Sequence, residues 1–475
     1  MNSPASDPKS IPPTPNEAED GLYAVRKKVY VRAVSGAFAT SRWALVWFTQ
    51  LLFYGLPWLT WNDRQAVLFH LTERKFYIFG WVFWPQDVFF LAILLIISAY
   101  ALFFFTAIAG RLWCGYACPQ TVYTEIFMWI EQKIEGDHNK RAKLDKAPMS
   151  ARKFGIKAAK YAAWGALALW TGFTFVAFFS PLDELLKSAR ALSFGPWELF
   201  WILFYGSFTY LFAGVMREQV CKYMCPYARF QSVMFDPDTL VITYDEDRGE
   251  PRGTRKKGVD PRTVNKGDCI DCGICVQVCP TGIDIRKGLQ YECIGCAACI
   301  DACDQVMDKM EYPRGLIRYS TENAVKKHWG RKEIIGHVLR PRTLIYGGVL
   351  ALVSIAFVWG LASREPLRVD ILRDRTSLAR EVEDGMIENV YRLQVMNMTE
   401  TSRSFRLNVS GLREARIDGA ESINVGPAAT QSVTVKVLVP GDAGKPGANE
   451  VFFVISPEDA PDLELREKTT FLMPN

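Results

Sequence analysis

Two cysteine runs with identical spacing constrain the fold of this chain more than any other feature. Each reads C-x2-C-x2-C-x3-C, and together they comprise Cys269, Cys272, Cys275, Cys279, Cys293, Cys296, Cys299 and Cys303. Gaps of two residues let a short loop present three thiolates to one face of an iron–sulfur cubane. Two zinc sites are the alternative, but zinc sites with four thiolates favour separated C-x2-C pairs. The spacing therefore predicts a dicluster ferredoxin-like segment around two [4Fe–4S] clusters.

The two runs are predicted to share their ligands. In ferredoxins with this spacing, the fourth cysteine of each run binds the other cluster. One cluster is therefore expected on Cys269, Cys272, Cys275 and Cys303, and the other on Cys279, Cys293, Cys296 and Cys299. Asp304 follows the second run where Pro280 follows the first. Because that proline shapes a turn without binding iron, ligation is expected to survive, and the crossing predicts clusters close enough to exchange electrons.

A second motif, C-x-Y-x-C-P, occurs twice and contains the remaining cysteines. Its copies hold Cys114, Cys118, Cys221 and Cys225, and an arginine precedes each copy (Arg111 and Arg217). An i, i+4 spacing on a helix would place both sulfurs of a copy on one helix face, and the following proline would start or end a helix. Each copy ends a helical hairpin, and a repeat around a pseudo-axis would bring both copies to one membrane face.

Four thiolates, with Met216 and Met224 nearby, would form a soft metal site. Soft sulfur ligands suit Cu(I), zinc or iron–sulfur clusters, and paired thiols can also reduce a metal by forming a disulfide. Because thiolates stabilise Cu(I) over Cu(II), neighbouring clusters would favour delivery of an electron to bound Cu(II). The alternative is that these cysteines are small buried residues at a membrane border. All 12 cysteines fall in the four runs, which favours metal or redox chemistry in a reducing compartment over disulfides.

Five apolar stretches have roughly the 20 residues that a helix needs to cross a bilayer. They cover residues 43–61, 88–109, 161–180, 197–216 and 344–362. Tryptophans at several ends, such as Trp58 and Trp197, fit an aromatic belt at the membrane surface. Five such stretches favour a multi-pass membrane protein over a soluble protein with buried core helices.

Lysine and arginine are distributed unevenly among the loops. Ten lie in residues 110–160, whereas the short loops after the first and third stretches hold three and two. The tail before the first stretch contains Arg26, Lys27, Lys28, Arg32 and Arg42. The positive-inside rule therefore predicts a cytoplasmic N-terminus, all four cysteine runs on the cytoplasmic side and a periplasmic C-terminus.

Residues 363–475 alternate apolar and polar residues and contain no cysteine. The segments NVYRLQVMN, SFRLNVSGL, SVTVKVLVP and NEVFFVI each predict a strand. About 110 residues with this pattern favour an immunoglobulin-like β-sandwich, and a different small β-barrel is the alternative. The predicted units are a tail (1–42), a four-helix membrane region (43–216), a cytoplasmic segment with both clusters (217–342), a fifth span (343–362) and the periplasmic β-domain (363–475).

Several functions lack support in the sequence. The chain has only four histidines, none of them inside a predicted span, so a membrane haem with two histidine ligands is not expected. No phosphate-binding glycine loop stands out. The net charge of +5 gives no global basic field for nucleic acid. The run Arg255-Lys256-Lys257 is interpreted as solvated or as contacting anionic membrane lipid.

Four stretches resemble the cytochrome c oxidase accessory proteins called CcoG, FixG or RdxA: RLWCGYACPQTVYTE, CKYMCPYARFQ, CIDCGICVQVCPTGIDIR and CIGCAACIDACD. The resemblance extends from about Lys28 to the end. It implies assembly of the cbb3-type cytochrome c oxidase in a Gram-negative inner membrane, with reduction of Cu(II) to Cu(I). It implies copper at Cys114, Cys118, Cys221 and Cys225, and as partners a copper-transporting ATPase, copper chaperones and other oxidase assembly factors.

The combined interpretation is a membrane-bound cupric reductase, an oxidoreductase acting on metal ions. In this hypothesis a cytoplasmic donor reduces the clusters, and the electrons pass to copper at the paired motifs. A quinol-linked electron carrier that feeds a periplasmic acceptor is one alternative. A non-catalytic scaffold whose β-domain docks oxidase subunits is another.

Overall fold

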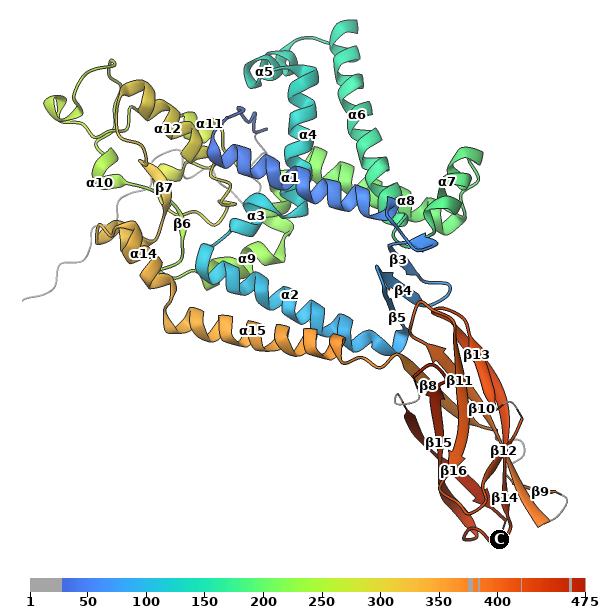
Figure 1. The fold of residues 1–475 in the computed structure, drawn as a ribbon. Coiled ribbons are helices and arrows are strands. Elements are labelled where there is room, and N and C mark those ends of the chain that lie inside the picture. Colours follow the sequence, from blue (N-terminus) through green and yellow to red (C-terminus); the bar gives the residue numbers. More distant parts are fainter. Residues whose placement is uncertain (1–27, 375–378, 383–384, 420, 461–463, 475) are drawn as a thin grey trace, which may run out of the picture. The chain divides into compact units, whose positions relative to one another are not determined.

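Figure 1 shows the computed structural model, which describes residues 28–374, 379–382, 385–419, 421–460 and 464–474. The predicted tail up to Lys27 therefore lies outside the described residues. The chain forms two compact units, each assembled from three stretches of sequence. Of the described residues, the first holds those of 28–46, 106–165 and 210–337, and the second holds those of 47–105, 166–209 and 338–474. All twelve cysteines belong to the first unit.

Three helical segments are long and apolar enough to cross a membrane, at Pro85–Ala109, Pro196–Met216 and Pro341–Ala362. They include the helices α2 (Val88–Ala109), α8 (Pro196–Thr209) and α15 (Pro341–Ala362). These segments match the second, fourth and fifth predicted spans and identify a membrane protein. A π-helix (Tyr210–Met216) continues α8, and a second π-helix (Val220–Met224) follows after residues 217–219. Isolated π-helical turns are frequent at functional sites.

The first and third predicted spans also form helices, but with other limits. Helix α1 covers Ala37–Gly55 and includes the buried Arg42. Helix α6 covers Ala151–Val176 and includes Lys153, Lys157 and Lys160 in its first half. Both helices begin before the apolar stretch and carry basic side chains with polar partners. Arg42 donates to the carbonyl of Cys296, and Lys153 donates to the carbonyls of Asp145 and Ala147. Neither meets the length and hydropathy of the three candidate spans among the described residues.

Shorter helices and strands connect these segments. The helices are α3 (Leu112–Tyr116), α4 (Pro119–Glu135), α5 (His138–Lys146) and α7 (Leu182–Ala191). Strands β1 (Thr60–Trp61) and β2 (Arg64–Gln65) form one hairpin, and β3 (Val67–His70), β4 (Lys75–Ile78) and β5 (Trp81–Phe83) form an antiparallel meander. Sequence analysis missed this meander, because its strands are too short to show an alternating pattern. Leu68, Tyr77 and Val82 are buried on it.

The ferredoxin-like segment is organised around a two-stranded antiparallel sheet of β6 (Val241–Tyr244) and β7 (Ile317–Ser320). Its helices are α9 (Pro226–Met234), α10 (Glu246–Gly249), α11 (Ile274–Gln277), α12 (Ala298–Met310), α13 (Glu322–Lys326) and α14 (Arg331–Val338). Gly273 and Ala297, the residues before α11 and α12, both have left-handed backbone angles. Each turn lies inside a cysteine run, so the thiols before and after it face a common centre.

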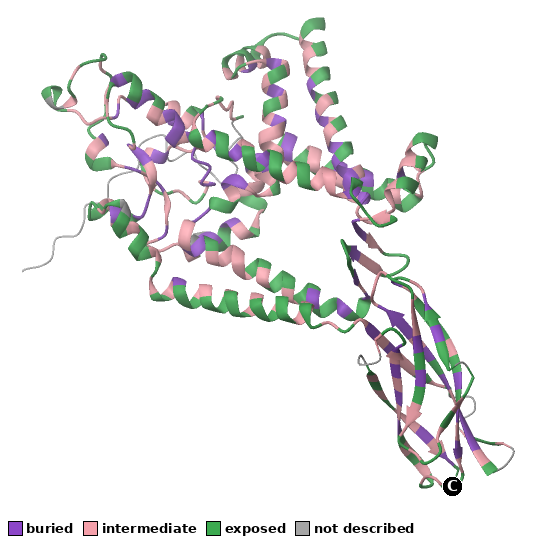
Figure 2. Cartoon of the chain, in the orientation of Figure 1, coloured by how far each residue is buried: buried purple, intermediate pink, exposed green. Residues whose placement is uncertain are grey.

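Residues 367–473 form a β-sandwich of two antiparallel sheets, and the predicted immunoglobulin-like β-domain is confirmed. One sheet has the order β12-β14-β10-β8, with β9 also pairing β10, and the other has the order β13-β11-β15-β16. The strands are β8 (Leu367–Arg373), β9 (Arg380–Val382), β10 (Met386–Asn397), β11 (Arg403–Ser410), β12 (Arg416–Asp418), β13 (Ser422–Val425), β14 (Thr430–Pro440), β15 (Gly447–Pro457) and β16 (Leu465–Met473). Alternate residues along β10, β14 and β15 are buried, as Figure 2 shows. These strands and β11 match the four predicted ones.

Candidate metal centre

The first group of thiols lies around one cavity in the ferredoxin-like segment. Cys269, Cys272, Cys275 and Cys303 all line it, together with Tyr244, Met307 and Ile317. The residue Cys272 is exposed, whereas Cys269 and Cys275 are buried. The structure thus gathers the four thiols that the spacing assigns to one cluster, although ligation itself remains a prediction.

The second group lies around a neighbouring cavity with an almost wholly apolar wall. Cys279, Cys293, Cys296 and Cys299 line it, with Ile242, Ile285 and Ile294 between them. Cys279 comes from the first run and Cys303 from the second, so each cavity takes one thiol from the opposite run. Cys275 lines both cavities, which therefore share a wall.

The donor set of both cavities fits an iron–sulfur cluster. Burial raises the pKa of Cys293 and Cys303 to about 12 and that of Cys275 to about 11. Burial thus disfavours the thiolate form of these three side chains, and binding of a metal group must displace their protons. Among the residues that the structure describes, no three histidine, cysteine or acidic side chains converge on a single ion. A group that fills the cavity suits these separated thiols better than one metal ion does.

The paired C-x-Y-x-C-P motifs correct one expectation, because neither lies on a single helix. Cys114 lies in α3 and Cys221 in the second π-helix. Cys118 and Cys225 have extended backbone angles and form the N-caps of α4 and α9. A residue before proline is driven out of the helical region, while the proline itself suits the first position of the next helix. Each motif is therefore a corner between two helices.

The two motifs are interlocked by reciprocal contacts. Arg111, which precedes the first motif, donates to the carbonyl of Ala228 in α9, the helix after the second motif. Arg217, which precedes the second motif, pairs with Glu131 in α4 at 2.8 Å. Gln120 donates in turn to the carbonyls of Phe212 and Arg217, at 2.9 and 3.2 Å. Each arginine thus holds the helix that follows the other motif, as a two-fold repeat would.

These contacts place the buried Arg111 near one thiol of each motif. Burial raises the pKa of Cys114 to about 12; Cys118 adds to the rise, whereas Arg111 opposes it. Burial also raises the pKa of Cys221 to about 12, and Arg111 opposes this rise as well. The guanidinium of Arg111 thus stands within electrostatic reach of one thiol from each motif. Because the described thiols do not converge on one ion, capture of a metal there requires their side chains to turn inward.

The first motif packs directly on the loop of the second ferredoxin cavity. A Cβ atom on Gly115 would lie 2.7 Å from the carbonyl oxygen of Gly295 and 2.9 Å from the Cα of Cys296. Cys114 and Cys221 pack against the same apolar cluster as Cys296 and Ile294. Only two facing glycines permit this backbone approach. Sequence analysis did not single out Gly115 or Gly295, although each stands between two cysteines, in CGYAC and in CIGC.

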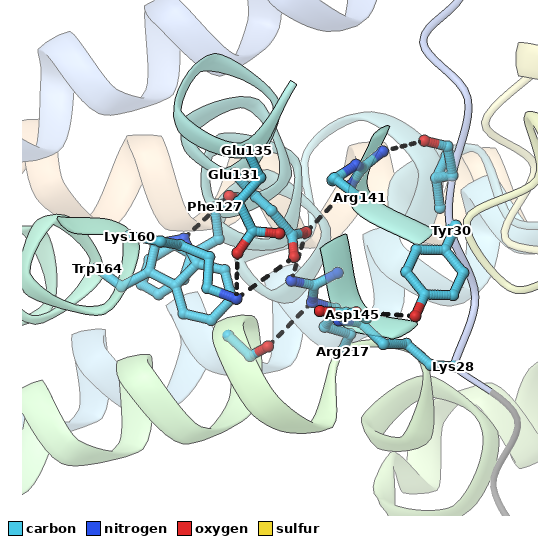
Figure 3. Close-up of polar contacts among 12 residues, drawn as sticks. Lys28, Tyr30, Phe127, Glu131, Glu135, Arg141, Asp145, Lys160, Trp164 and Arg217 are labelled. Carbon is cyan, nitrogen blue, oxygen red and sulfur yellow. Dashed lines mark hydrogen bonds and ion pairs between the residues drawn. The ribbon is translucent and has the colours of Figure 1, made fainter. Parts of the chain in front are cut away.

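A buried group of ions supports this arrangement (Figure 3). Glu131 pairs with Arg141 at 3.1 Å and with Lys160 at 3.7 Å, in addition to Arg217. Glu135 pairs with Lys160 at 3.0 Å and with Lys157 at 2.8 Å. The side chain of Lys160 is only 2 % exposed. Sequence analysis had counted these cations as loop charges, but they tie α4, α6 and Arg217 into one buried network.

The fold and the site together define a membrane protein that carries electrons on iron–sulfur clusters. Residues 216–322 match the family described as a 4Fe-4S dicluster domain, and residues 91–136 match a 4Fe-4S binding domain. Residues 357–474 match the IG-like fold at the C-terminus of FixG.

Whole-chain relatives give the family. The nitrogen fixation protein FixG of Rhizobium meliloti is 38% identical, covering 92% of this chain and 91% of the relative. Protein RdxA of Cereibacter sphaeroides is 38% identical, covering 89% of this chain and 91% of the relative. Protein RdxB of the same organism is also 38% identical, with coverage of 92% and 93%. The chain belongs to the FixG/RdxA/RdxB family.

Proposed function

We propose that this iron–sulfur protein reduces Cu(II) to Cu(I) at Cys114, Cys118, Cys221 and Cys225. The observation that supports this proposal is the backbone contact between Gly115 and Gly295. It brings the first of the paired motifs against the loop that carries Cys296, one of the proposed ligands of the second cluster. When bound, the clusters supply single electrons at this position. The eight ferredoxin cysteines are proposed as their ligands, divided as the two cavities divide them.

The protein's own residues provide the rest of the chemistry. Thiolates favour Cu(I) over Cu(II), so the four motif cysteines would hold the product more tightly than the substrate. Burial raises the pKa of Cys114, Cys118 and Cys221, so copper binding at these thiols releases protons. The cation of Arg111 would offset part of the negative charge of the thiolates that remain, which lowers the cost of burying them.

The cellular setting is proposed from the family and the loop charges. We propose that all five helices cross the inner membrane, with the cysteines on the cytoplasmic side and the sandwich in the periplasm. The reaction would serve assembly of a cbb3-type cytochrome c oxidase. A copper-transporting ATPase and copper chaperones would take up the Cu(I), and other assembly factors would meet the protein at the membrane.

The test is anaerobic reduction of Cu(II), followed with a Cu(I)-specific chelator, after the clusters have been reduced with dithionite and excess reductant removed. The double variant Cys114→Ser/Cys118→Ser should lose Cu(I) formation while its iron content and cluster absorbance stay at the level of the parent protein. The variant Cys221→Ser/Cys225→Ser should behave alike, because the two motifs are interlocked. Unchanged Cu(I) formation in both variants would show that these thiols do not serve the reaction.

A second measurement distinguishes a docking role of the sandwich from the proposed reductase activity. Deletion of residues 363–475 removes the sandwich and leaves all twelve cysteines in place. If oxidase assembly fails in this deletion yet persists in the cysteine variants, the protein acts as a scaffold and not as a reductase.

A further inference from the structure

The two ferredoxin cavities differ in how far solvent reaches their thiols. Cys272 in the first cavity is the only exposed residue among the twelve cysteines, all of which the structure describes. The second cavity has no exposed thiol, and its Cys296 loop packs against the first C-x-Y-x-C-P motif at Gly115. Cys275 lies in the wall of both cavities. An electron that leaves through the second cavity toward the motifs would therefore enter the protein through the first.

A basic loop lies beside the first cavity. Residues 250–268, which connect α10 to the first cysteine run, contain six lysines and arginines against three acidic residues, a net charge of +3. The loop touches the cavity wall, because the amide of Gly253 donates to the carbonyl of Cys269 at 3.1 Å. Arg286 and, more weakly, Arg252 hold the pKa of the Asp284 carboxyl below its usual range, and Arg286 itself lines the cavity. The surface next to the exposed thiol thus carries an excess of positive charge.

The loop is held in place by contacts with the rest of the ferredoxin-like segment. The Nε atom of Arg255 donates to the hydroxyl of Tyr312 at 2.8 Å, and the guanidinium lies 5.1 Å from the centre of that ring. The same hydroxyl donates to the carbonyl of Val259 at 2.7 Å, which ties both arms of the loop to one side chain. Arg255 is therefore anchored, while its neighbour Lys256 is exposed. A loop fixed in this way presents its charges without being ordered anew at each encounter.

Part of the positive charge is left for a partner. Lys257 pairs with Glu311 at 2.9 Å, but the two side chains are 62% and 68% exposed, so the pair is weak. Lys256 and Lys287 are exposed and have no ion pair among the described residues. Asp271, the acidic neighbour of Cys272, is already paired with Arg286 at 2.6 Å. Carboxylates of another molecule are the groups that would complement this surface.

We propose that this surface, formed by residues 250–268 with Cys272 and Lys287, docks a small, soluble, acidic protein that carries single electrons. The inference rests on the proposed electron-transfer function and identifies its donor by class. In the proposed topology the loop faces the cytoplasm. Opposite charges steer the carrier to the loop, and Cys272 places a proposed cluster ligand at the point of contact. Each encounter passes one electron: the carrier is oxidised, this protein is reduced by one electron, and no bond or proton changes place.

Anionic lipid is the competing occupant of the run Arg255-Lys256-Lys257. Lipid head groups attract basic segments near a membrane surface through charge alone. They require no particular relation between the cations and a redox site. An electron carrier does require one, because it must approach a cluster closely, and the basic loop adjoins the cavity of the one exposed thiol. The position of the charges therefore favours a protein partner.

The experiment uses the full-length, anaerobically purified protein in phosphatidylcholine nanodiscs, with an oxidised plant-type [2Fe–2S] ferredoxin of net negative charge as the probe. Binding is measured by titration calorimetry and needs no electron transfer. Lys256→Glu/Lys257→Glu reverses two charges of the loop and should weaken binding about tenfold or more at low ionic strength. Lys143→Glu/Lys146→Glu reverses two exposed lysines of α5, which lines neither ferredoxin cavity, and should change binding far less. Lys256→Arg/Lys257→Arg keeps both charges and should bind like the parent protein.

Salt and electron transfer give two further readouts. Raising the ionic strength from about 0.01 M to about 0.15 M shortens the screening length from about 30 Å to about 8 Å. Binding to the parent protein should weaken accordingly, and binding to Lys256→Glu/Lys257→Glu should change little. In stopped flow, reduced ferredoxin should bleach the cluster absorbance of the parent faster than that of this variant. After reduction by dithionite, both proteins should form Cu(I) at the same rate.

Three outcomes overturn the proposal. The first is equal affinity of the two charge-reversal variants, and the second is no binding to the parent protein. The third is protection of residues 252–258 from hydrogen exchange when phosphatidylglycerol replaces phosphatidylcholine in the nanodiscs without ferredoxin, which would identify lipid as the occupant. The copper proposal is judged separately. If the parent protein reduced by dithionite forms no Cu(I), the proposed function fails, whereas the binding result stands.

Discussion

The sandwich and the cysteine-bearing unit have cores of opposite character. Tyr391, Phe453 and the other core residues of the sandwich are apolar and fully buried. Its buried Asn389 is satisfied by two hydrogen bonds with the backbone of Leu472, at 2.9 and 3.0 Å. The cysteine-bearing unit instead buries thiols together with Arg111, Glu131 and Lys160. The sandwich can be stabilised by apolar burial alone, whereas the other core depends on charge pairing and on the groups that its thiols hold.

Removal of iron should produce the largest difference in stability between the cysteine-bearing unit and the sandwich. Without clusters, two cavities lined by thiols lose their contents, and the loops of residues 269–303 lose the bonds that tie them together. We expect hydrogen exchange in residues 269–303 to approach that of an unfolded chain after anaerobic chelation. Exchange in residues 386–397 and 447–457, the central strands of the sandwich, should not change. Equal loss of protection in both regions would mean that the sandwich depends on the metal-bearing unit.

Loss of one carboxylate in the buried network should have the next largest effect. Glu131→Gln leaves Arg141, Lys160 and Arg217 without their shared partner, and breaking such a buried group costs about 3–5 kcal/mol. The unfolding transition of the cysteine-bearing unit should shift to lower denaturant, and that of the sandwich should stay in place. The control is Glu450→Gln on the sandwich surface, where the pair with Lys468 is 66% and 60% exposed and contributes about 0–1 kcal/mol. A similar small effect of both variants would contradict a core held by charge pairing.

The same contrast explains which parts of the molecule were predictable from sequence. Strands such as β10 and β14 repeat a period of two over eleven or more residues, so their pattern is readable without any partner. The strands β9, β12 and β13 have only three or four residues and show no usable period. Helices α2, α8 and α15 were predicted, because they are apolar apart from Glu198 near the start of α8 and Arg342 near the start of α15. Helices α1 and α6 mix apolar residues with cations. Their predicted limits, 43–61 and 161–180, therefore begin later than the helices Ala37–Gly55 and Ala151–Val176 do.

The candidate site was predictable where a motif with known ligand spacing specifies it. The spacing of the cysteine runs predicts two ligand sets, each with one thiol from the other run; ligation itself stays a prediction, and the thiols of each set line one cavity. The corner at Cys118 and Cys225 could have been predicted, because the proline after each cysteine disfavours a continuous helix through it. The link from Arg111 to Ala228 could not be predicted. The repeat predicts that the two motifs meet, but it does not say which side chain of one contacts which carbonyl of the other.

An added methyl group at Gly115 should weaken the contact between the two kinds of cysteine site. Gly115→Ala would place a Cβ 2.7 Å from the Gly295 oxygen, and overpacking of this kind costs about 1–3 kcal/mol. We expect slower Cu(I) formation at unchanged iron content, measured by stopped flow after dithionite reduction. The control is Gly155→Ala in α6, where a Cβ meets nothing within 4 Å and where alanine should add roughly 0.5–1 kcal/mol of stability. Equal rates of Cu(I) formation in both variants would show that the Gly115 contact does not contribute to electron transfer between the two cysteine sites.

The smallest expected effect is a pH dependence at the edge of the ion network. Burial alone would raise the pKa of the Asp145 carboxyl, but hydrogen bonds from Lys157, Lys28 and Tyr30 hold that pKa far below its usual range. A carboxyl with a lowered folded-state pKa stabilises the fold above its unfolded pKa of about 4, and this contribution disappears as the pH falls toward the folded-state pKa. Because Lys28 is 43% exposed and solvent screens the pair, the contribution should not exceed about 1 kcal/mol. Denaturant unfolding of the cysteine-bearing unit at pH 7 and at pH 3 should therefore show a smaller difference in Asp145→Asn than in the parent protein. An identical difference in both proteins would mean that Asp145 contributes nothing to the acid sensitivity of this core.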